Sequence, residues 1–194
     1  MAYEIIVVGT SWGGLVALGQ LIDGLPQTFE LPMVIIQHRH KGSGQLMQTL
    51  LQSHTSISVC EVEDKTSVVP GRVFIAPPDY HVLFDDEGSF ALSTEAPVRY
   101  SRPSIDVTFE SAADVYGEHT VGVVLTGANA DGARGLKRIV DRGGLALVQT
   151  PATAESPMMP TAALRSVPGA RQLTIPQIAA TLGSLPAMRV GGAR

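Results

Sequence analysis

Residues 9–13 contain the serine best suited to act as a nucleophile. They read G-T-S-W-G, follow the apolar run at residues 5–8, and precede leucines and isoleucines at helical spacing. The order fits the G-x-S-x-G elbow, a sharp strand-to-helix turn that exposes a serine hydroxyl and leaves the next backbone N–H free to bind an oxyanion. Ser11 is therefore the first candidate nucleophile.

The same turn has two other interpretations. Unpaired N–H groups and the helix dipole at the start of a first helix also suit a phosphate or nucleotide. However, Gly9, Gly13 and Gly14 do not match the G-x-G-x-x-G spacing, and no G-K-[ST] follows as a P-loop requires. The third interpretation is a turn with a purely structural role. The rest of the chain has to decide among them.

A histidine stands where the second buried run ends. Residues 33–37 read M-V-I-I-Q, and His38 follows them directly. Ligands of open α/β sheets bind outside the carboxyl ends of parallel strands, so Ser11 and His38 are expected side by side. The alternative is a histidine hydrogen-bonded near a loop. The other histidines follow no such clear buried run: His40, His54, His81 and His119.

An aspartate occupies a third strand end. Residues 121–125 predict a buried strand, and the loop that follows contains Asp131, which can simply cap the next helix. A nucleophilic serine needs a base, and the base needs an acidic partner that fixes its tautomer and stabilises its cation. Ser11, His38 and Asp131 supply these groups. Their chain order differs from that of ordinary α/β-hydrolases, which argues against that fold but not against the chemistry.

The elements that must position these residues alternate between strand and helix. This alternation predicts an α/β fold, a three-layer, mainly parallel, doubly wound sheet with an antiparallel hairpin portion. The short spacing of the runs between residues 57 and 93 indicates antiparallel hairpins rather than a crossover helix. Ser104 or Asp106 can cap one later helix, and Thr174 with Gln177 fits a capping box.

Length and composition restrict the number of domains, the kinds of partner and the location that we expect. The 194 residues suffice for one substantial core, so we expect a single domain over residues 1–186 and a flexible tail over 187–194. A net charge of −4, with 44% hydrophobic and 16% charged residues, lends no support to a nucleic-acid or anionic-membrane partner. No apolar run reaches the roughly 18 residues of a membrane span, and the N-terminus lacks a signal-peptide pattern, so a cytoplasmic protein without membrane insertion is expected. Cys60, the only cysteine, is interpreted as structural.

Five ordered blocks together resemble the catalytic domain of the bacterial chemotaxis protein-glutamate methylesterases, the CheB type. They read VGTSWGG, IQH, GRVFIAP, RPSID and LTGANADGA, at residues 8–14, 36–38, 71–77, 102–106 and 125–133. The match runs in register from about residue 4 to about residue 182. It implies hydrolysis of glutamate methyl esters on the cytoplasmic helices of methyl-accepting chemoreceptors, with release of methanol. In some members of the family it also implies deamidation of receptor glutamines.

The resemblance also assigns roles. Ser11 is the implied nucleophile, His38 the general base and acid, and Asp131 the residue that orients His38. By the elbow argument the backbone N–H of Trp12 is one oxyanion donor, and the N–H of Ala128 can supply the other. The implied mechanism requires no metal or organic cofactor.

Three departures from the family pattern bear on substrate and regulation. The elbow usually reads S-T-G-G, so Trp12 replaces a small hydroxyl residue, and Ala128 and Asn129 stand where methionine and glycine are usual. The N-terminal receiver domain typical of the family does not precede the catalytic strand. Constitutive activity, control by a separate receiver or signalling protein, and origin from a longer protein all stay open.

Two alternative functions remain, and one surface prediction follows. The chain can be a triad hydrolase of another protein ester or amide, or a non-catalytic binding module with the same fold.

The cationic loop at residues 39–45 suits a lid or an acidic partner, or is a solvated surface loop. Charge alone suggests Arg39, Lys41 and Arg102 as receptor contacts.

Overall fold

The apolar run that precedes Ser11 forms β1 (Ile5–Thr10), the central strand of a parallel sheet. The computed structural model describes residues 2–39 and 46–188. In that part of the chain the sheet has seven strands in the order β3-β4-β2-β1-β7-β8-β9, and every neighbouring pair is parallel. The other six are β2 (Met33–Gln37), β3 (Ser58–Glu61), β4 (Arg72–Ile75), β7 (Thr120–Val124), β8 (Leu145–Gln149) and β9 (Arg171–Leu173).

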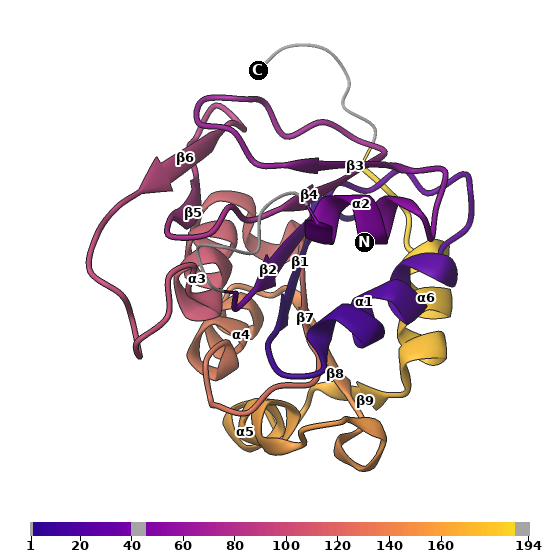
Figure 1. The fold of residues 1–194 in the computed structure, drawn as a ribbon. Coiled ribbons are helices and arrows are strands. Elements are labelled where there is room, and N and C mark those ends of the chain that lie inside the picture. The colour runs from indigo at the N-terminus through magenta and orange to yellow at the C-terminus, as the bar shows by residue number, and fades with distance from the viewer. Residues whose placement is uncertain (1, 40–45, 189–194) are drawn as a thin grey trace.

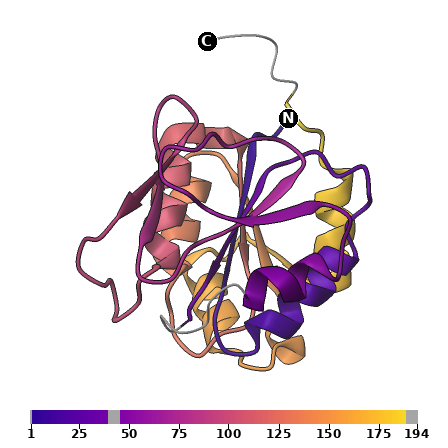
Figure 2. The same ribbon diagram turned by 45° about the horizontal axis from the view of Figure 1, so that its top comes forward.

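Helices cover both faces of this sheet, as Figures 1 and 2 show. One face packs against α1 (Gly14–Asp23), α2 (Leu46–Gln52) and α6 (Ile175–Ser184). The opposite face packs against α3 (Ile105–Tyr116), α4 (Ala133–Asp141) and α5 (Met158–Ser166). An antiparallel hairpin, β5 (His81–Phe84) with β6 (Phe90–Ser93), lies beside α3. The predicted three-layer α/β fold is confirmed.

Burial on both faces explains why the central strands are apolar at every position. Along β1, Ile6 and Val8 point into the core beneath α1 and α6, whereas Ile5 and Val7 point into the core beneath α3 and α4. All four are fully buried. Strands of a parallel sheet with helices on both sides read as continuous hydrophobic runs for this reason.

The prediction of antiparallel hairpins throughout residues 57–93 was wrong for its first half. β3 and β4 pair in parallel, with Cys60 opposite Phe74, and β4 also pairs in parallel with β2. Val73, Phe74 and Ile75 are all buried, and their side chains enter both cores. Such a strand fits only inside the sheet. β5 and β6 form the antiparallel portion.

Strand β9 has no signal in the sequence. It lies at the edge of the sheet and pairs with β8, and its three residues are exposed or half-buried. An edge strand without an apolar face shows no hydrophobic periodicity, so the sequence predicts only a connection there.

The capping predictions are confirmed. Ser104 is the N-cap of α3, where its side chain accepts from the Val107 N–H, and Thr174 with Gln177 forms the capping box of α6. At the end of the described residues, Ala187 lies opposite Tyr3 in a parallel β-bridge, in which the Tyr3 N–H donates to the Pro186 carbonyl and the Met188 N–H donates to the Tyr3 carbonyl. The rest of the predicted tail, 189–194, lies outside the described residues. No helix within the described ranges is long and apolar enough to span a membrane.

Candidate active site

The carboxyl ends of β1, β2 and β7 surround one cleft of about 630 Å³. Ser11 and Trp12 line it after β1, His38 lines it after β2, and Ala128 lines it from the loop after β7. From β1 the chain first builds the β2 side of the sheet and then returns to build the β7 side. Ligand sites of open α/β sheets lie outside the strand ends at such a reversal.

Hydrogen bonds between the strand ends hold Ser11 in place. The Ser11 N–H donates to the carbonyl of Thr126 at 3.0 Å. Gln37 Nε2 donates to the carbonyl of Ser11 at 2.8 Å and to that of His38 at 3.0 Å. The amide of Gln37 therefore fixes the elbow after β1 relative to the end of β2.

Two glycines make this turn possible. Gly13 has a φ of 75°, in the left-handed region that side chains with a Cβ rarely adopt. A Cβ on Gly14 would lie 2.0 Å from Oε1 of Gln37. A Cβ at residue 14 would therefore force the side chains of Gln37 and Thr10 to shift.

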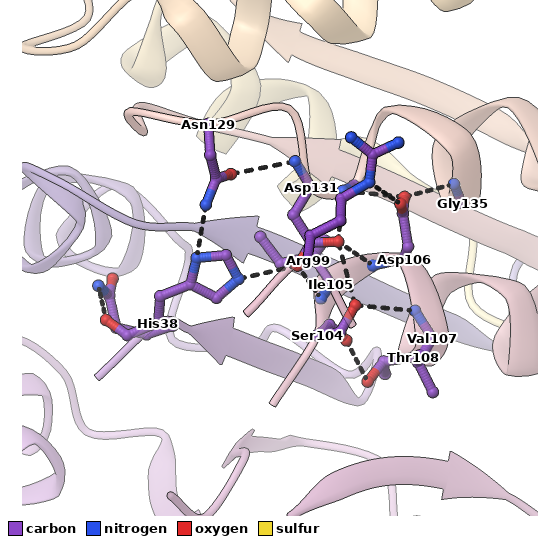
Figure 3. Close-up of polar contacts among 12 residues, drawn as sticks. His38, Arg99, Ser104, Ile105, Asp106, Val107, Thr108, Asn129, Asp131 and Gly135 are labelled. Atoms are coloured by element: carbon purple, nitrogen blue, oxygen red, sulfur yellow. Dashed lines mark hydrogen bonds and ion pairs between the residues drawn. The ribbon is translucent and has the colours of Figure 1, made fainter. Parts of the chain in front are cut away.

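Asp131 is buried and contacts His38 directly. Its Oδ2 lies 2.8 Å from Nε2 of His38. Figure 3 marks this contact with a dashed line. The carboxylate also accepts from the Ile105 N–H at 2.7 Å, and from the Asp106 N–H and Ser104 Oγ at 3.0 Å each. These donors belong to the N-terminus of α3, where free N–H groups and the helix dipole stabilise an anion.

The hydrogen bonds to Asp131 determine its charge. Burial by itself raises the pKa of this carboxyl, but the hydrogen bonds from His38 and from the Asp106 and Ile105 N–H groups outweigh burial and hold the pKa below its ordinary value. Asp131 is therefore an anion at neutral pH. An anion at this position fixes the imidazole orientation and stabilises its cationic form.

The two buried aspartates cap each other's helices. Asp131 precedes α4 but accepts from the start of α3, whereas Asp106 in α3 accepts from the N–H groups of Gly132 and Gly135 at 2.9 and 2.8 Å. The N-cap of α4 is Gly132, which has no side chain to cap the helix, and its N–H also donates to Oδ1 of Asp131 at 3.1 Å. Burial raises the pKa of Asp106, the Gly135 N–H offsets part of that rise, and the charge of Asp131 adds to it. Asp131 thus does more than cap the helix that follows it.

Ser11 and His38 share the cleft, but no hydrogen bond joins them in the described structure. The second ring nitrogen of His38, Nδ1, lies 3.2 Å from Nδ2 of Asn129. The backbone N–H groups of Trp12 and Ala128 donate to no acceptor within residues 2–39 and 46–188. Both N–H groups therefore remain available to a ligand in the cleft.

Sequence reasoning gave His81 a minor place and Gln37 no role. His81 is buried, its Nδ1 accepts from the Ser104 N–H at 3.2 Å, and its Nε2 lies 3.2 Å from the carbonyl of Ala96. It thereby fixes the backbone just before α3. Only the block R-P-S-I-D, which surrounds Ser104, could have indicated that this segment is near the site.

Two of the cations predicted as receptor contacts line the cleft and also bond within the chain. Arg39 pairs with Glu61 and donates to the carbonyl of Ala76, and Arg102 donates to Asp79 at 2.7 Å. Arg102 also donates to the carbonyls of residues 94 and 95. Both guanidinium groups are therefore engaged in holding loops together. Lys41 and the rest of the predicted cationic loop, residues 40–45, lie outside the described residues.

Other reactive groups do not gather elsewhere in the described part of the chain. It contains no set of three or more His, Cys, Asp or Glu side chains arranged to bind a metal ion. Cys60 lies half-buried in β3, and burial raises the pKa of its thiol. A thiol with a raised pKa is a poor nucleophile.

The fold and the cleft define a doubly wound α/β domain with its candidate site at the carboxyl ends of parallel strands. The family model that matches, over residues 6–182, is that of the CheB methylesterase. The crystal structure of the Thermotoga maritima CheB methylesterase catalytic domain is similar, with a TM-score of 0.89 and 31% identity. That similarity covers 94% of this chain and 98% of the Thermotoga chain. The chain belongs to the CheB methylesterase family.

Relatives from other bacteria have corresponding names. A Leptospira interrogans protein, provisionally named a protein-glutamate methylesterase/protein-glutamine glutaminase, is 43% identical over 92% of this chain and 93% of its own length. A Carboxydothermus hydrogenoformans protein with that double name is 39% identical over 83% of this chain. The Myxococcus xanthus protein-glutamate methylesterase FrzG is 34% identical over 93% of this chain. The chain spans about half of the last two relatives, 49% and 54% of their lengths.

Proposed function

We propose that this protein is a serine esterase that hydrolyses glutamate methyl esters on chemoreceptors and releases methanol. One observation carries the proposal: buried Asp131 lies 2.8 Å from His38, and His38 lines the same cleft as the elbow serine. Membership of a methylesterase family supports the substrate class. The substrate is the cytoplasmic helix region of methyl-accepting receptors, which places the protein in the cytoplasm. Residues 1–186 form the proposed catalytic domain.

The proposed mechanism uses Ser11, His38 and Asp131 as a triad. Ser11 Oγ attacks the ester carbonyl while Nδ1 of His38 accepts the hydroxyl proton, and Asp131 stabilises the resulting imidazolium through Nε2–H. His38 then protonates the leaving methoxide, so methanol departs and an acyl-serine remains. Water attacks the acyl-serine with His38 again as base, and this step releases the glutamate carboxylate and restores Ser11.

The N–H groups of Trp12 and Ala128 are the proposed oxyanion donors. Both line the cleft, and neither donates to an acceptor in the described structure. Preorganised donors of this kind stabilise the charge that develops on the carbonyl oxygen in the transition state. A carbonyl bound there would lie next to Ser11, at the start of α1.

Glutamine deamidation is a second proposed activity of the same site. Relatives from Leptospira and Carboxydothermus are named as protein-glutamine glutaminases as well as methylesterases. An amide substrate would form the same acyl-serine and release ammonia instead of methanol. The exposed Trp12, 66% accessible at the cleft, supports a remaining alternative, hydrolysis of a different protein ester or amide.

Covalent labelling tests whether the site is catalytic at all. A serine-directed fluorophosphonate should label folded wild-type protein at Ser11, as located by peptide mass spectrometry. Ser11→Ala should remain unlabelled, and Ser53→Ala, which alters an exposed serine at the end of α2, should be labelled at the wild-type rate. Failure of the folded wild type to react would exclude every hydrolase proposal and leave the non-catalytic binding module.

A further inference from the structure

Asn129 contacts the atom of His38 that has to accept the proton of Ser11. Its Nδ2 lies 3.2 Å from Nδ1 of His38, on the side of the ring away from Asp131. Asn129 is half-buried in the loop between β7 and α4, and the amide lies over the imidazole edge in Figure 3. This contact exists in the structure, whereas a hydrogen bond between Ser11 and His38 does not.

The neighbouring hydrogen bonds fix the direction of this contact. Oδ1 of Asn129 accepts from the backbone N–H of Asp131 at 3.0 Å, so the NH₂ group must face His38. An NH₂ group can only donate, and Nδ1 must therefore be an unprotonated acceptor. The imidazole proton is then on Nε2, which donates to Oδ2 of Asp131. All three contacts agree on a neutral His38 with its lone pair directed at Asn129.

This arrangement opposes the first chemical step. Nδ1 has one lone pair, and a hydrogen bond from Asn129 competes with one from the Ser11 hydroxyl. Once Nδ1 takes the proton, two donors face each other across the contact. The amide cannot simply turn round, because Oδ1 would then lose the Asp131 N–H and the NH₂ group would face it.

We propose that Asn129 is a latch on the catalytic base, a positioning residue that occupies Nδ1 of His38 at rest and leaves it when substrate enters the cleft. The inference rests on the proposed function, because it assumes that His38 activates Ser11. The latch lies directly beside Ala128, the proposed oxyanion donor on the same loop. A substrate carbonyl that binds the Ala128 N–H therefore acts on the residue next to Asn129. Substrate binding is in this way coupled to the departure of Asn129 from Nδ1 of His38.

Two variants separate this role from simple support of the loop. Asn129→Ala removes both the donor to His38 and the acceptor for the Asp131 N–H. Asn129→Asp keeps the acceptor but has no donor, and its carboxylate favours a protonated imidazole. The other ionisable groups around His38 are the same in every variant: Asp131 after β7, Asp106 behind it on α3, and Arg39 with Glu61 at the ends of β2 and β3.

The readout is the rate of fluorophosphonate labelling of Ser11 from pH 5 to 9, with Ser11→Ala as the blank. Loss of one neutral hydrogen bond should speed labelling of Asn129→Ala roughly 3- to 10-fold on the neutral plateau. It should also move the acid limb of the profile to higher pH, because the neutral imidazole loses a stabilising donor. The acid limb of Asn129→Asp should move further in the same direction.

A merely structural role gives the opposite pattern. Asn129→Ala would then react more slowly, Asn129→Asp would behave like the wild type because it keeps the Asp131 contact, and neither acid limb would move. Any of these results overturns the latch. If no variant and no wild type is labelled, the proposed function fails and the latch fails with it; normal labelling with unchanged profiles removes the latch alone.

Nitrogen-15 NMR of His38 gives a readout that needs no activity. The wild type should show a neutral ring protonated at Nε2, with Nδ1 shifted as a hydrogen-bond acceptor. In Asn129→Ala the proton should stay on Nε2, and the Nδ1 resonance should move toward that of a free lone pair. An unchanged Nδ1 resonance would contradict the contact on which the proposal rests.

Discussion

At the scale of single residues, Asp131 is the group most firmly fixed in the site. Its carboxylate accepts from His38, from Ser104 Oγ and from two N–H groups at the start of α3. The sequence placed Asp131 on a strand-end loop beside Ser11 and His38, and the geometry brings Asp131 and His38 together. The sequence could not show that Asp131 binds a helix other than the one it precedes.

Replacing Asp131 by asparagine should nearly abolish activity while leaving the fold intact. Asparagine has a similar shape, but it has no charge to stabilise the imidazolium, and its NH₂ group competes for the wrong tautomer of His38. We expect Asp131→Asn to lower kcat for ester hydrolysis by about a thousand- to ten-thousand-fold. Circular dichroism checks the fold, and a kcat within tenfold of wild type would refute the orienting role.

The same substitution should change how stability depends on pH. Because the folded-state pKa of Asp131 is lowered, its stabilisation is present above the unfolded pKa of about 3.9 and is lost as pH falls through the folded value. Asp131→Asn should therefore cost about 2 kcal/mol of unfolding free energy at pH 7, and the difference from wild type should shrink below about pH 4. Urea unfolding at pH 7 and pH 3 measures it. A difference that widens in acid would contradict this account of the charge.

At the scale of elements, the turn between β1 and α1 determines the position of Ser11. A Cβ on Gly14 would displace Gln37, whose amide joins the carbonyls of Ser11 and His38. Gly14→Ala should thus lower kcat at least about tenfold, since small displacements of reacting groups are costly. Gly19→Ala in the same helix is the matched control, because a Cβ there meets only the end of the His54 side chain, at 3.1 Å. Equal kcat values for both variants would show that the Gln37 contact does not position the site.

The turn at residues 98–101 stores strain beside the cleft. Val98 and Ser101 bond to each other at 3.1 and 2.9 Å, and Arg99 and Tyr100 between them have φ values of 49° and 65°. Left-handed backbone at a residue other than glycine costs about 1 kcal/mol or more. Tyr100 is fully exposed and lines the cleft, so its ring is within reach of a substrate that enters there.

Relief of that strain should stabilise the fold and at the same time weaken substrate binding. Tyr100→Gly should raise the free energy of unfolding by up to about 1 kcal/mol, because glycine adopts left-handed backbone without a steric penalty. It should also raise KM for a receptor fragment several-fold and leave kcat unchanged. Tyr100→Asn, which tolerates the backbone but lacks the ring, should show the same rise in KM. An unchanged KM in both variants would rule out contact between Tyr100 and the substrate.

At the scale of the whole molecule, the predictable features are those set by local pattern. The apolar strands, the elbow glycines and the capping box each depend on neighbours in sequence, and all were predicted. The parallel position of β4 and the presence of β9 depend on which strands lie beside them, so local spacing misjudged the first and missed the second. The contact between Asn129 and His38 joins residues 91 positions apart, and the sequence carried no sign of it beyond an unusual residue type.

The same distinction applies to the substrate. Ser11, His38 and Asp131 follow the family pattern, whereas Trp12 departs from it inside the first block and Tyr100 lies outside the blocks. Trp12 and Tyr100 are both exposed and line the cleft. The chemistry of the site can therefore follow the family while the bordering side chains set which protein enters. An assay with a defined receptor substrate tests the chemistry of the site and its choice of substrate together.

Methanol release from a methylated cytoplasmic receptor fragment is the most direct test of the central claim. The wild-type protein should release methanol in an amount equal to the glutamate carboxylates formed, and Ser11→Ala, verified as folded, should release none above the uncatalysed rate. Ser53→Ala should match the wild type. Release that persists in Ser11→Ala would contradict the serine mechanism, and no release by folded wild type would contradict the proposed substrate.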